Sequence, residues 1–259
     1  MIEKWLDLPE AGVFGVLAVL YGVAALLIAW LTFGKPFVDR VRAIDGVVAP
    51  FFGAASVLFA LLTGFLANDI ATRNAQALRA VQVEANELQN VFTLSVASAS
   101  DMRSIRAALL AYVKSAIADD WPAMENDEGA AKTEAAYSEL LHEVSDPKIA
   151  KESGEAVHAA LLNATVRAGT ARSDRIALAS DRTTSFKWEV VLVLGVITQI
   201  SIAIVHLQRR GAQIAALTVF SAAVVVTLGL IALQERPFGG AFAIAPASLQ
   251  EFVRLRGGG

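Results

Sequence analysis

Four stretches of this chain contain no Asp, Glu, Lys or Arg, and each is long enough to cross a membrane as a helix. They comprise residues 11–34, 46–68, 190–208 and 211–234. The hydrocarbon core of a bilayer is about 30 Å thick, and a helix of about 20 residues spans it. A charged residue at the centre of such a helix costs about 2.5–3.5 kcal/mol on insertion scales. The sequence therefore predicts an all-α integral membrane protein with four transmembrane helices.

The four stretches form two close pairs, separated by a long polar segment. We expect transmembrane helices at about 11–34, 46–68, 188–208 and 211–234. The chain then divides into the first helix pair (1–68), a helical extramembrane domain (69–187), the second helix pair (188–235) and a C-terminal turn with a short amphipathic helix (236–259). The C-terminal helix could lie on the membrane surface or pack against the domain. Only 18% of the residues are charged, against about 25% in typical soluble domains, which agrees with this organisation.

Enzyme chemistry finds little support in the composition. The chain has no cysteine, which excludes disulfides, cysteine-ligated metals and thiol catalysis. His142, His158 and His206 lack metal-ligand spacing, and no nucleotide-binding or hydrolase motif occurs. A net charge of −3 argues against nucleic acid as a partner. We expect no enzyme activity, no cofactor and no metal site.

Positive charge is concentrated in the two short connections between paired helices. Lys35, Arg40 and Arg42 lie in the first connection, and Arg209 and Arg210 lie in the second. Cytoplasmic loops carry an excess of Lys and Arg. We therefore expect a multi-pass protein of the cell (inner) membrane, with the central domain and both termini on the extracytoplasmic side.

The central domain reads as a helical bundle. Apolar residues continue beyond the second membrane stretch at three- and four-residue spacing (Leu78, Val81, Ala85, Leu88 and Phe92), which predicts one helix from about 46 to about 98 with a coiled-coil-like seam. Residues 119–129 contain Pro, Gly and five acids (Asp119, Asp120, Glu125, Asp127 and Glu128), and they read as a solvated loop without the spacing of a calcium loop. We expect one helix to follow this loop and to end at about 144, and another to begin at Pro147. Helical spacing then continues through 161–179 toward Trp188.

A stripe of small residues runs along the second membrane stretch. Its members recur every three or four residues: Gly53, Ser56, Ala60, Thr63 and Ala67. Such a stripe allows close packing of membrane helices, or it lines a pore, where small side chains leave width and hydroxyls contact water. Asn68 and Asp69 follow it at the membrane boundary, and Asp69 repeated by symmetry would form an acidic ring that favours cations.

Two polar residues, Thr198 and Gln199, lie near the centre of the third membrane stretch. A glutamine at this depth is costly when it faces lipid, so we expect it to turn inward and form an inter-helix hydrogen bond. Tyr21 and Thr227 are candidate partners by depth alone.

Several segments together resemble the bestrophin-like domain family, four-pass membrane proteins of bacteria and plants. They are RVRAIDGVVAPFFGAASVLFALLTGF, AVQVEANELQNVF, SIRAALLAYVKSAIADDWPAME, ARSDRIALAS and ERPFGGAFAIAPASLQEF. Arg106, Tyr112, Trp121 and Pro122 match an Arg…Tyr…Trp-Pro pattern. The chain departs from the family pattern in two places: Glu235 stands where an Asp is usual, and Ile44-Asp-Gly-Val-Val48 replaces a His-containing signature.

The resemblance implies kinship with bestrophins, oligomeric anion channels (some bacterial relatives conduct cations) whose pore is lined by the second helix and whose large domain is cytosolic. That last property is opposite to the placement by charge, which we keep as our expectation. Our leading hypothesis is a homo-oligomeric ion channel, a tetramer or pentamer in the lipid bilayer, with a cation preference. A non-conducting signalling or scaffold protein is the alternative, and a transporter is a further one, less supported because the chain shows no internal repeat.

Overall fold

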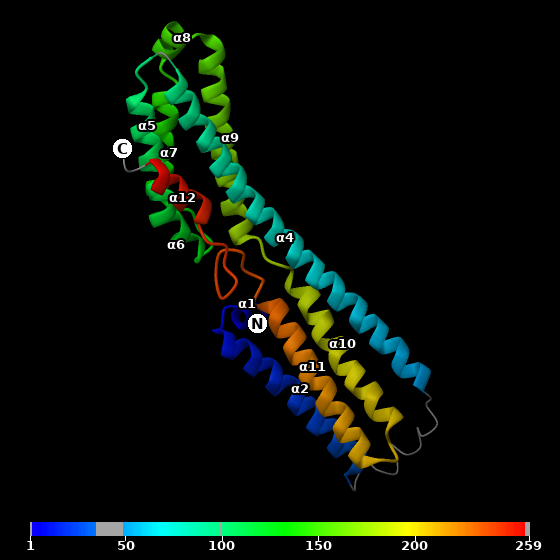
Figure 1. Ribbon diagram of the computed structural model, residues 1–259. Coiled ribbons are helices and arrows are strands. Elements are labelled where there is room, and N and C mark those ends of the chain that lie inside the picture. The colour runs from blue at the N-terminus through cyan, green and yellow to red at the C-terminus, as the bar shows by residue number, and fades with distance from the viewer. Residues whose placement is uncertain (1, 35–48, 99, 257–259) are drawn as a thin grey trace. The chain divides into compact units, whose positions relative to one another are not determined.

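The structure is a computed structural model, and it describes residues 2–34, 49–98 and 100–256 (Figure 1). The helices are α1 (Ile2–Leu6), α2 (Glu10–Phe33), α4 (Ala49–Ala97), α5 (Arg103–Ser115), η1 (Ala116–Asp120), α6 (Trp121–Met124), α7 (Ala131–Val144), α8 (Pro147–Ser153), α9 (Glu155–Ser180), α10 (Ser185–Val205), α11 (Arg210–Ala232) and α12 (Ala247–Arg256). These residues contain no strand, so the predicted all-α fold is confirmed.

The prediction of four membrane spans is also confirmed. Within the described ranges, four helical stretches are long and apolar enough to cross a membrane: Glu10–Phe33, Phe52–Ala97, Glu155–Val205 and Arg210–Ala232. The expected start of the second span at 46–48, the basic residues Lys35, Arg40 and Arg42, and the Ile44–Val48 departure lie outside the described residues.

The chain forms two compact units. Unit 1 contains residues 2–72 and 183–235, and unit 2 contains residues 73–182 and 236–256, each over its described part. The chain passes from one unit to the other within α4, after Thr72. The segment after Glu235 therefore groups with the residues that lie between the second and third spans.

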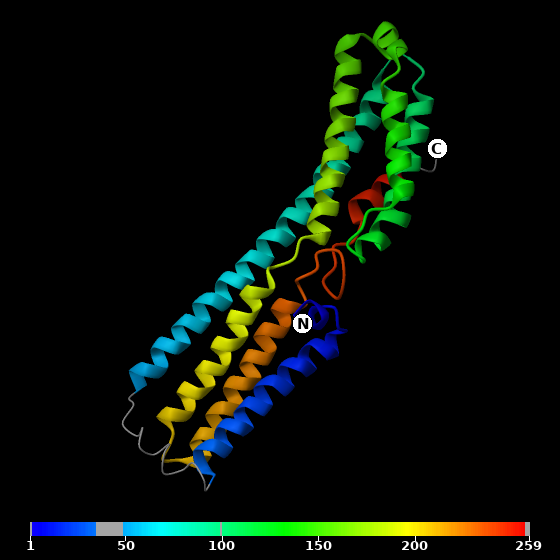
Figure 2. The ribbon, with the colours of Figure 1, turned by 180° about the vertical axis from the view of Figure 1, so that it is seen from behind.

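Unit 1 is a membrane-type helix bundle. The long helices α2 and α11 lie side by side (Figure 2), and α10 packs against both. The core residues are Val13, Leu17 and Tyr21 of α2, Leu66 and Ile70 of α4, Trp188 and Val191 of α10, and Val224, Leu228 and Ile231 of α11. Large aliphatic side chains cover the outer surfaces, including Val19 and Leu26 of α2 and Val219 of α11, as expected where lipid is the solvent.

Two glycines allow the close approach of helices in unit 1. A Cβ atom at Gly195 of α10 would lie 2.2 Å from the hydroxyl oxygen of Tyr21, and one at Gly229 of α11 would lie 2.2 Å from the Phe14 ring. Small residues at helix interfaces are typical of membrane proteins, because association there depends on tight packing.

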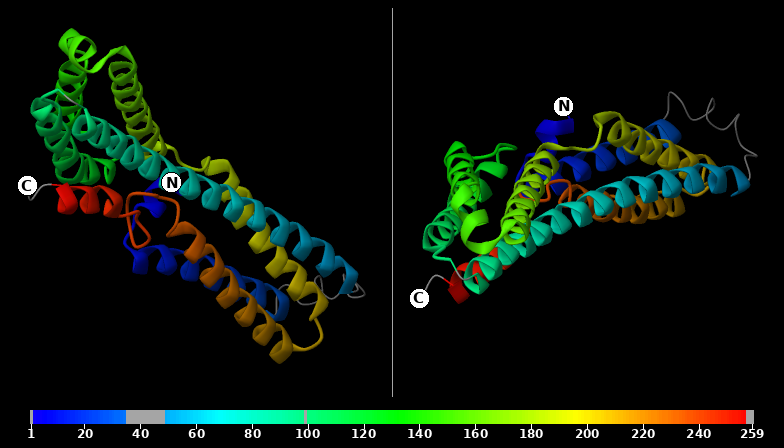
Figure 3. Two further views of the ribbon diagram at one scale, coloured as in Figure 1. Left: turned by 45° about the horizontal axis from the view of Figure 1, so that its top comes forward. Right: turned by 90° about the horizontal axis from the view of Figure 1, so that it is seen from above.

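Unit 2 is a helical bundle with a core of its own. Its buried apolar side chains come from α4 (Val81, Leu88 and Val91), α5 (Ile105 and Leu109), α7 (Leu140 and Val144), α9 (Leu161 and Ala168) and α12 (Leu249 and Phe252). Figure 3 shows α12 against α5, and the Phe252 ring meets Phe92 edge-on at 6.0 Å. Of the two placements left open for the C-terminal helix, the structure has the one packed against the domain.

The expected loop at 119–129 is wrong for its first half. The chain remains helical from Arg103 through Met124, first as α5, then as the π-helical turn η1, then as α6. Burial of Trp121 and Met124 favours the helical path, and Pro122 is tolerated because it lies in the first turn of α6. A π turn inserts one extra residue into a helix and is often found at functional sites.

Candidate functional site

The residues of the small stripe lie along one side of α4 in unit 1. Thr63 is buried, Gly53, Ser56 and Ala67 are half-buried, and Ala60 is exposed. The buried face of this helix carries Phe59, Leu66 and Ile70, and the Phe59 ring packs on Phe220 of α11 at 5.8 Å. The stripe therefore follows the border between the packed face of α4 and its open face.

The open face of α4 is covered by no described part of the chain. It carries Val57, Leu61 and Phe65, all exposed, together with the small residues Ala54 and Gly64. Successive residues of a helix are about 100° apart, so Asn68 continues this face one turn beyond Gly64 and two turns beyond Leu61. This surface is open to lipid, to a second copy of the chain or to the water of a pore.

Two hydroxyls of the stripe have no partner. The Oγ atom of Ser56 and the Oγ1 atom of Thr63 are buried, and neither forms a hydrogen bond with any described residue. Buried polar atoms are nearly always hydrogen-bonded to protein or to water. Both readings of the stripe offer partners for these atoms, because a packed helix brings backbone oxygens and a pore brings water.

Asp69 lies at the end of the stripe in an ion pair. Its carboxylate binds the ammonium group of Lys187, which begins the chain's return into the membrane on α10. Both side chains are about half exposed, and exposed pairs contribute only about 0–1 kcal/mol. Beside the pair, a cavity of about 380 Å³ is lined by Leu62, Phe65 and Asn68 of α4 and by Phe186 and Val190 of α10. Lys187 therefore offsets the charge of Asp69 within one subunit without holding it firmly.

The polar residues of α10 form an interior network. The side-chain NH₂ of Gln199 donates to the backbone oxygen of Tyr21 at 3.0 Å and to the hydroxyl of Ser221 at 2.8 Å. Thr198 is buried, and its hydroxyl donates to the backbone oxygen of Leu194. Thr227 is exposed, so the suggestion of Thr227 as a partner was wrong, and Ser221 occupies that role. The network joins α2, α10 and α11.

A second group of polar residues is buried inside unit 2. Glu84 of α4, Asp120 of η1 and Arg175 of α9 are all 0% exposed, and Arg172 of α9 is nearly so. The Nε of Arg175 donates to Glu84 at 2.8 Å, and the Nε of Arg172 donates to Asp120 at 2.8 Å. A further bond of 3.2 Å joins Arg175 to Asp120. Two carboxylates thus neutralise two guanidinium groups, and we call these four residues the buried ion cluster.

Aromatic side chains complete the surroundings of the cluster. The hydroxyl of Tyr112 donates to Glu84 at 2.6 Å, and the Trp121 ring lies 4.4 Å from the Arg175 guanidinium carbon. Trp121 in turn meets Phe238 edge-on at 6.0 Å. Tyr112 and Trp121 belong to the Arg…Tyr…Trp-Pro pattern, Arg172 and Arg175 to the ARSDRIALAS segment, and Phe238 to the ERPFGG segment. Segments that carry the family resemblance therefore meet here.

The surroundings shift the pKa values of Asp120, Arg175 and the neighbouring Tyr112. Burial alone raises the pKa of Asp120, but hydrogen bonds from Arg172 and the Ala130 amide, with the charge of Arg175, outweigh it and lower the pKa. Burial would lower the pKa of Arg175, and the charge and hydrogen bonds of Glu84 raise it instead. Burial and the neighbouring Glu84 charge raise the pKa of Tyr112 well above its usual value. Each charged side chain of the cluster therefore lies against a side chain of opposite charge.

Sequence reasoning missed most of this cluster. Asp120 was assigned to a solvated loop, which is wrong, because it lies in η1 and is paired by two arginines. Arg172 and Arg175 fall on the helix face that also carries Leu161 and Ala168, and that placement of charge on an apolar face was the available signal. Over the described ranges, no group of three or more His, Asp or Glu side chains could hold a metal.

Comparison with known proteins identifies relatives for most of the chain. The sequence model of the bestrophin-like domain matches residues 18–249. Seventeen chains of solved structures match, among them crystal structures of single-residue variants of a bacterial bestrophin homologue from Klebsiella pneumoniae. One has 12% sequence identity and a TM-score of 0.69, covering 93% of this chain and 97% of that chain. Another has 13% identity and a TM-score of 0.67, covering 91% and 96%. No curated protein sequence matches.

Proposed function

Because the chain belongs to the bestrophin-like family, we propose that it forms a homo-oligomeric ion channel whose pore is lined by α4. The open face of α4 in unit 1 carries the proposal. It is uncovered within the described residues, it borders the stripe of small residues, and it ends in Asn68. Residues 69–187, with the C-terminal segment, would surround the vestibule of this channel.

The other outer helices of unit 1 suit lipid better than water. The exposed side of α2 carries Val19, Leu26, Leu27 and Trp30, a large apolar surface that ends in an aromatic residue typical of the membrane interface. On α4, Ala54, Ala60 and Gly64 interrupt the large side chains. Four or five copies of α4 around an axis leave width at these small residues.

The mouth of this pore would hold one Asp69 and one Lys187 from each subunit. A ring of carboxylates favours cations, and a ring of ammonium groups favours anions. Because the exposed ion pair is weak, we propose that Asp69 sets a modest cation preference that Lys187 reduces. Removing Asp69 should then shift selectivity toward anions, and removing Lys187 should shift it toward cations.

Purified protein in planar bilayers tests the proposal. We expect discrete currents that favour cations, a larger preference in Lys187→Gln and a loss or reversal of preference in Asp69→Lys. Glu10→Lys is the control, since Glu10 is an exposed acid at the start of α2, a helix that does not line the proposed pore. Absence of current from an intact oligomer would favour the scaffold alternative, and currents unaffected by Asp69→Lys would remove this residue from the mouth.

We further propose that the domain and both termini face the extracytoplasmic side of the inner membrane, on the basis of the basic connections. The chain has no cysteine, so Ser138→Cys, an exposed position on α7, introduces a unique label site. Reaction with a membrane-impermeant maleimide on intact cells supports this orientation. Protection in intact cells with labelling after lysis would reverse it.

A further inference from the structure

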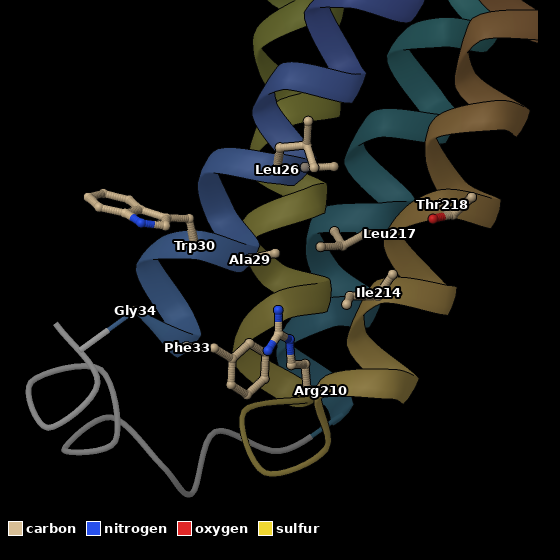
Figure 4. Close-up of a pocket in the computed structure, with 10 residues that line it drawn as sticks. Leu26, Ala29, Trp30, Phe33, Gly34, Arg210, Ile214, Leu217 and Thr218 are labelled. Carbon is tan, nitrogen blue, oxygen red and sulfur yellow. The ribbon is translucent and has the colours of Figure 1, made fainter. Parts of the chain in front are cut away.

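A cavity of about 380 Å³ lies between the end of α2 and the start of α11 in unit 1 (Figure 4). Its lining residues are Ala25, Leu26, Ala29, Trp30, Phe33, Gly34, Arg210, Ile214, Leu217 and Thr218. The volume falls within the range of about 300–1,000 Å³ typical of sites for small molecules. Ala25 and Ala29 are small, whereas Leu26, Trp30 and Phe33 of the same lining are large.

The wall of the cavity is mostly apolar and partly exposed. Leu26 is 72% exposed and Ile214 is 44% exposed, so the groove opens on the outer surface of the helix pair. Figure 4 shows the side chains of Ala29, Leu217 and Ile214 around the same space, whereas the Trp30 ring points away from it. Within a bilayer, a hydrocarbon chain fills such an apolar groove without the free-energy cost of burying a polar group.

One end of the groove is cationic. Arg210 is the first residue of α11, and its guanidinium group reaches into the space beside the Phe33 ring (Figure 4). Arg210 is exposed, and no ion pair joins it to any residue of the described ranges. Arg209 and His206 lie just before it at the same helix ends. A guanidinium at the boundary of an apolar groove is complementary to a phosphate group held above an acyl chain.

We propose that this groove binds an anionic glycerophospholipid. The acyl chain lies against Leu26, Ala29 and Leu217, and the phosphate diester accepts hydrogen bonds from Arg210. A headgroup with net negative charge is preferred, because a zwitterionic headgroup brings an ammonium group that repels the guanidinium. Basic pockets between membrane helices are a known means of binding anionic headgroups. The site is independent of conduction, since α4 does not line it.

Native mass spectrometry of the detergent-purified protein tests the site, with phosphatidylglycerol and phosphatidylcholine titrated separately. We expect phosphatidylglycerol to bind at one molecule per subunit, and phosphatidylcholine to bind more weakly. Arg210→Gln should weaken phosphatidylglycerol binding about fivefold or more, since one Arg near an anionic surface contributes about 1 kcal/mol. Ala29→Phe should abolish binding by filling the groove while leaving the charge in place.

Two matched variants control for charge and size. Arg209→Gln removes the same charge one residue earlier, outside the cavity lining, and Ala18→Phe adds the same ring at an exposed position elsewhere on α2. Both should bind phosphatidylglycerol as the native chain does. Equal losses in Arg209→Gln and Arg210→Gln would overturn the site in favour of diffuse electrostatic attraction. Unchanged lipid binding by Ala29→Phe, with loss of the oligomer, would identify the occupant as a second copy of the chain.

Discussion

Substituting Glu84→Gln tests how strongly the buried ion cluster holds unit 2 together. Arg175 is 0% exposed, so its charge has no access to water and depends wholly on its protein partners. Glu84 accepts two bonds from it, at 2.8 and 3.2 Å. The glutamine keeps the shape and one acceptor oxygen, but it removes the negative charge and places an NH₂ group against the guanidinium.

The expected loss of stability depends on the partners that Arg175 retains in Glu84→Gln. Breaking a buried ion pair by removing one partner costs about 3–5 kcal/mol, because the remaining charge is left buried. Arg175 keeps the carboxylate of Asp120 at 3.2 Å and the stacked ring of Trp121. We therefore expect the lower end of that range, about 3 kcal/mol, which raises the population of locally open molecules roughly a hundredfold.

Hydrogen–deuterium exchange of the full chain in nanodiscs measures this change at α9 and at the unit 2 part of α4. Asp101→Asn is the matched control, since Asp101 pairs with Arg103 in good geometry but both side chains are mostly exposed. Exposed pairs contribute about 0–1 kcal/mol, so exchange at α5 should change by less than about fivefold.

A double variant tests whether an unpaired buried charge causes the loss of stability in Glu84→Gln. The double variant Glu84→Leu with Arg175→Met removes both charges and fills similar volume, so it should recover most of the lost protection. If Glu84→Gln alters exchange no more than Asp101→Asn does, the cluster is not a set of tight ion pairs. If the double variant is as open as the single one, loss of packing rather than an unpaired charge is the cause.

Three further predictions concern single residues of the two units. Gln199→Leu removes two inter-helix hydrogen bonds and should cost about 1–2 kcal/mol in thermal melts in detergent, whereas Thr227→Val at an exposed position should be neutral. Gly195→Ala should cost about 1–3 kcal/mol by overpacking, because its Cβ would clash with a tyrosine hydroxyl, while Gly22→Ala has no atom within 4 Å and should not destabilise. The lowered pKa of Asp120 stabilises the fold fully above the unfolded value of about 3.9. Exchange protection of unit 2 should therefore fall as pH drops through the folded pKa below that value, and Asp120→Asn should remove this part of the pH dependence.

The membrane part of the fold could be predicted because lipid imposes a simple rule. A span must be long, apolar and helical, so the absence of charge locates α2, α10 and α11 closely: the observed helices are Glu10–Phe33, Ser185–Val205 and Arg210–Ala232. The first charge after a span marks the membrane edge, however, and not the edge of a packing unit. Ile70 lies beyond Asp69 and is still in the core of unit 1.

Depth along a helix could be predicted, but rotation about it could not. The position of Gln199 at the centre of its span predicted that it faces inward, which holds in the structure. The choice of Ser221 over Thr227 depends on which side of α11 faces α10. Both residues lie in α11, where apolar residues occur on all sides of the helix, so the sequence does not distinguish its packed side from its lipid side.

The two adjacent acids Asp119 and Asp120 show why the buried ion cluster escaped prediction. Any average of hydropathy or turn preference treats them alike, yet Asp119 pairs with the exposed Lys132 and Asp120 is fully buried against Arg172. The π turn of η1 contains both residues, and helical geometry directs consecutive side chains about 100° apart. Burial of Asp120 is possible only because α9 supplies two guanidinium groups from 52 and 55 residues away. The information lies in the pairing of distant charges on apolar faces, and a single segment read alone cannot contain it.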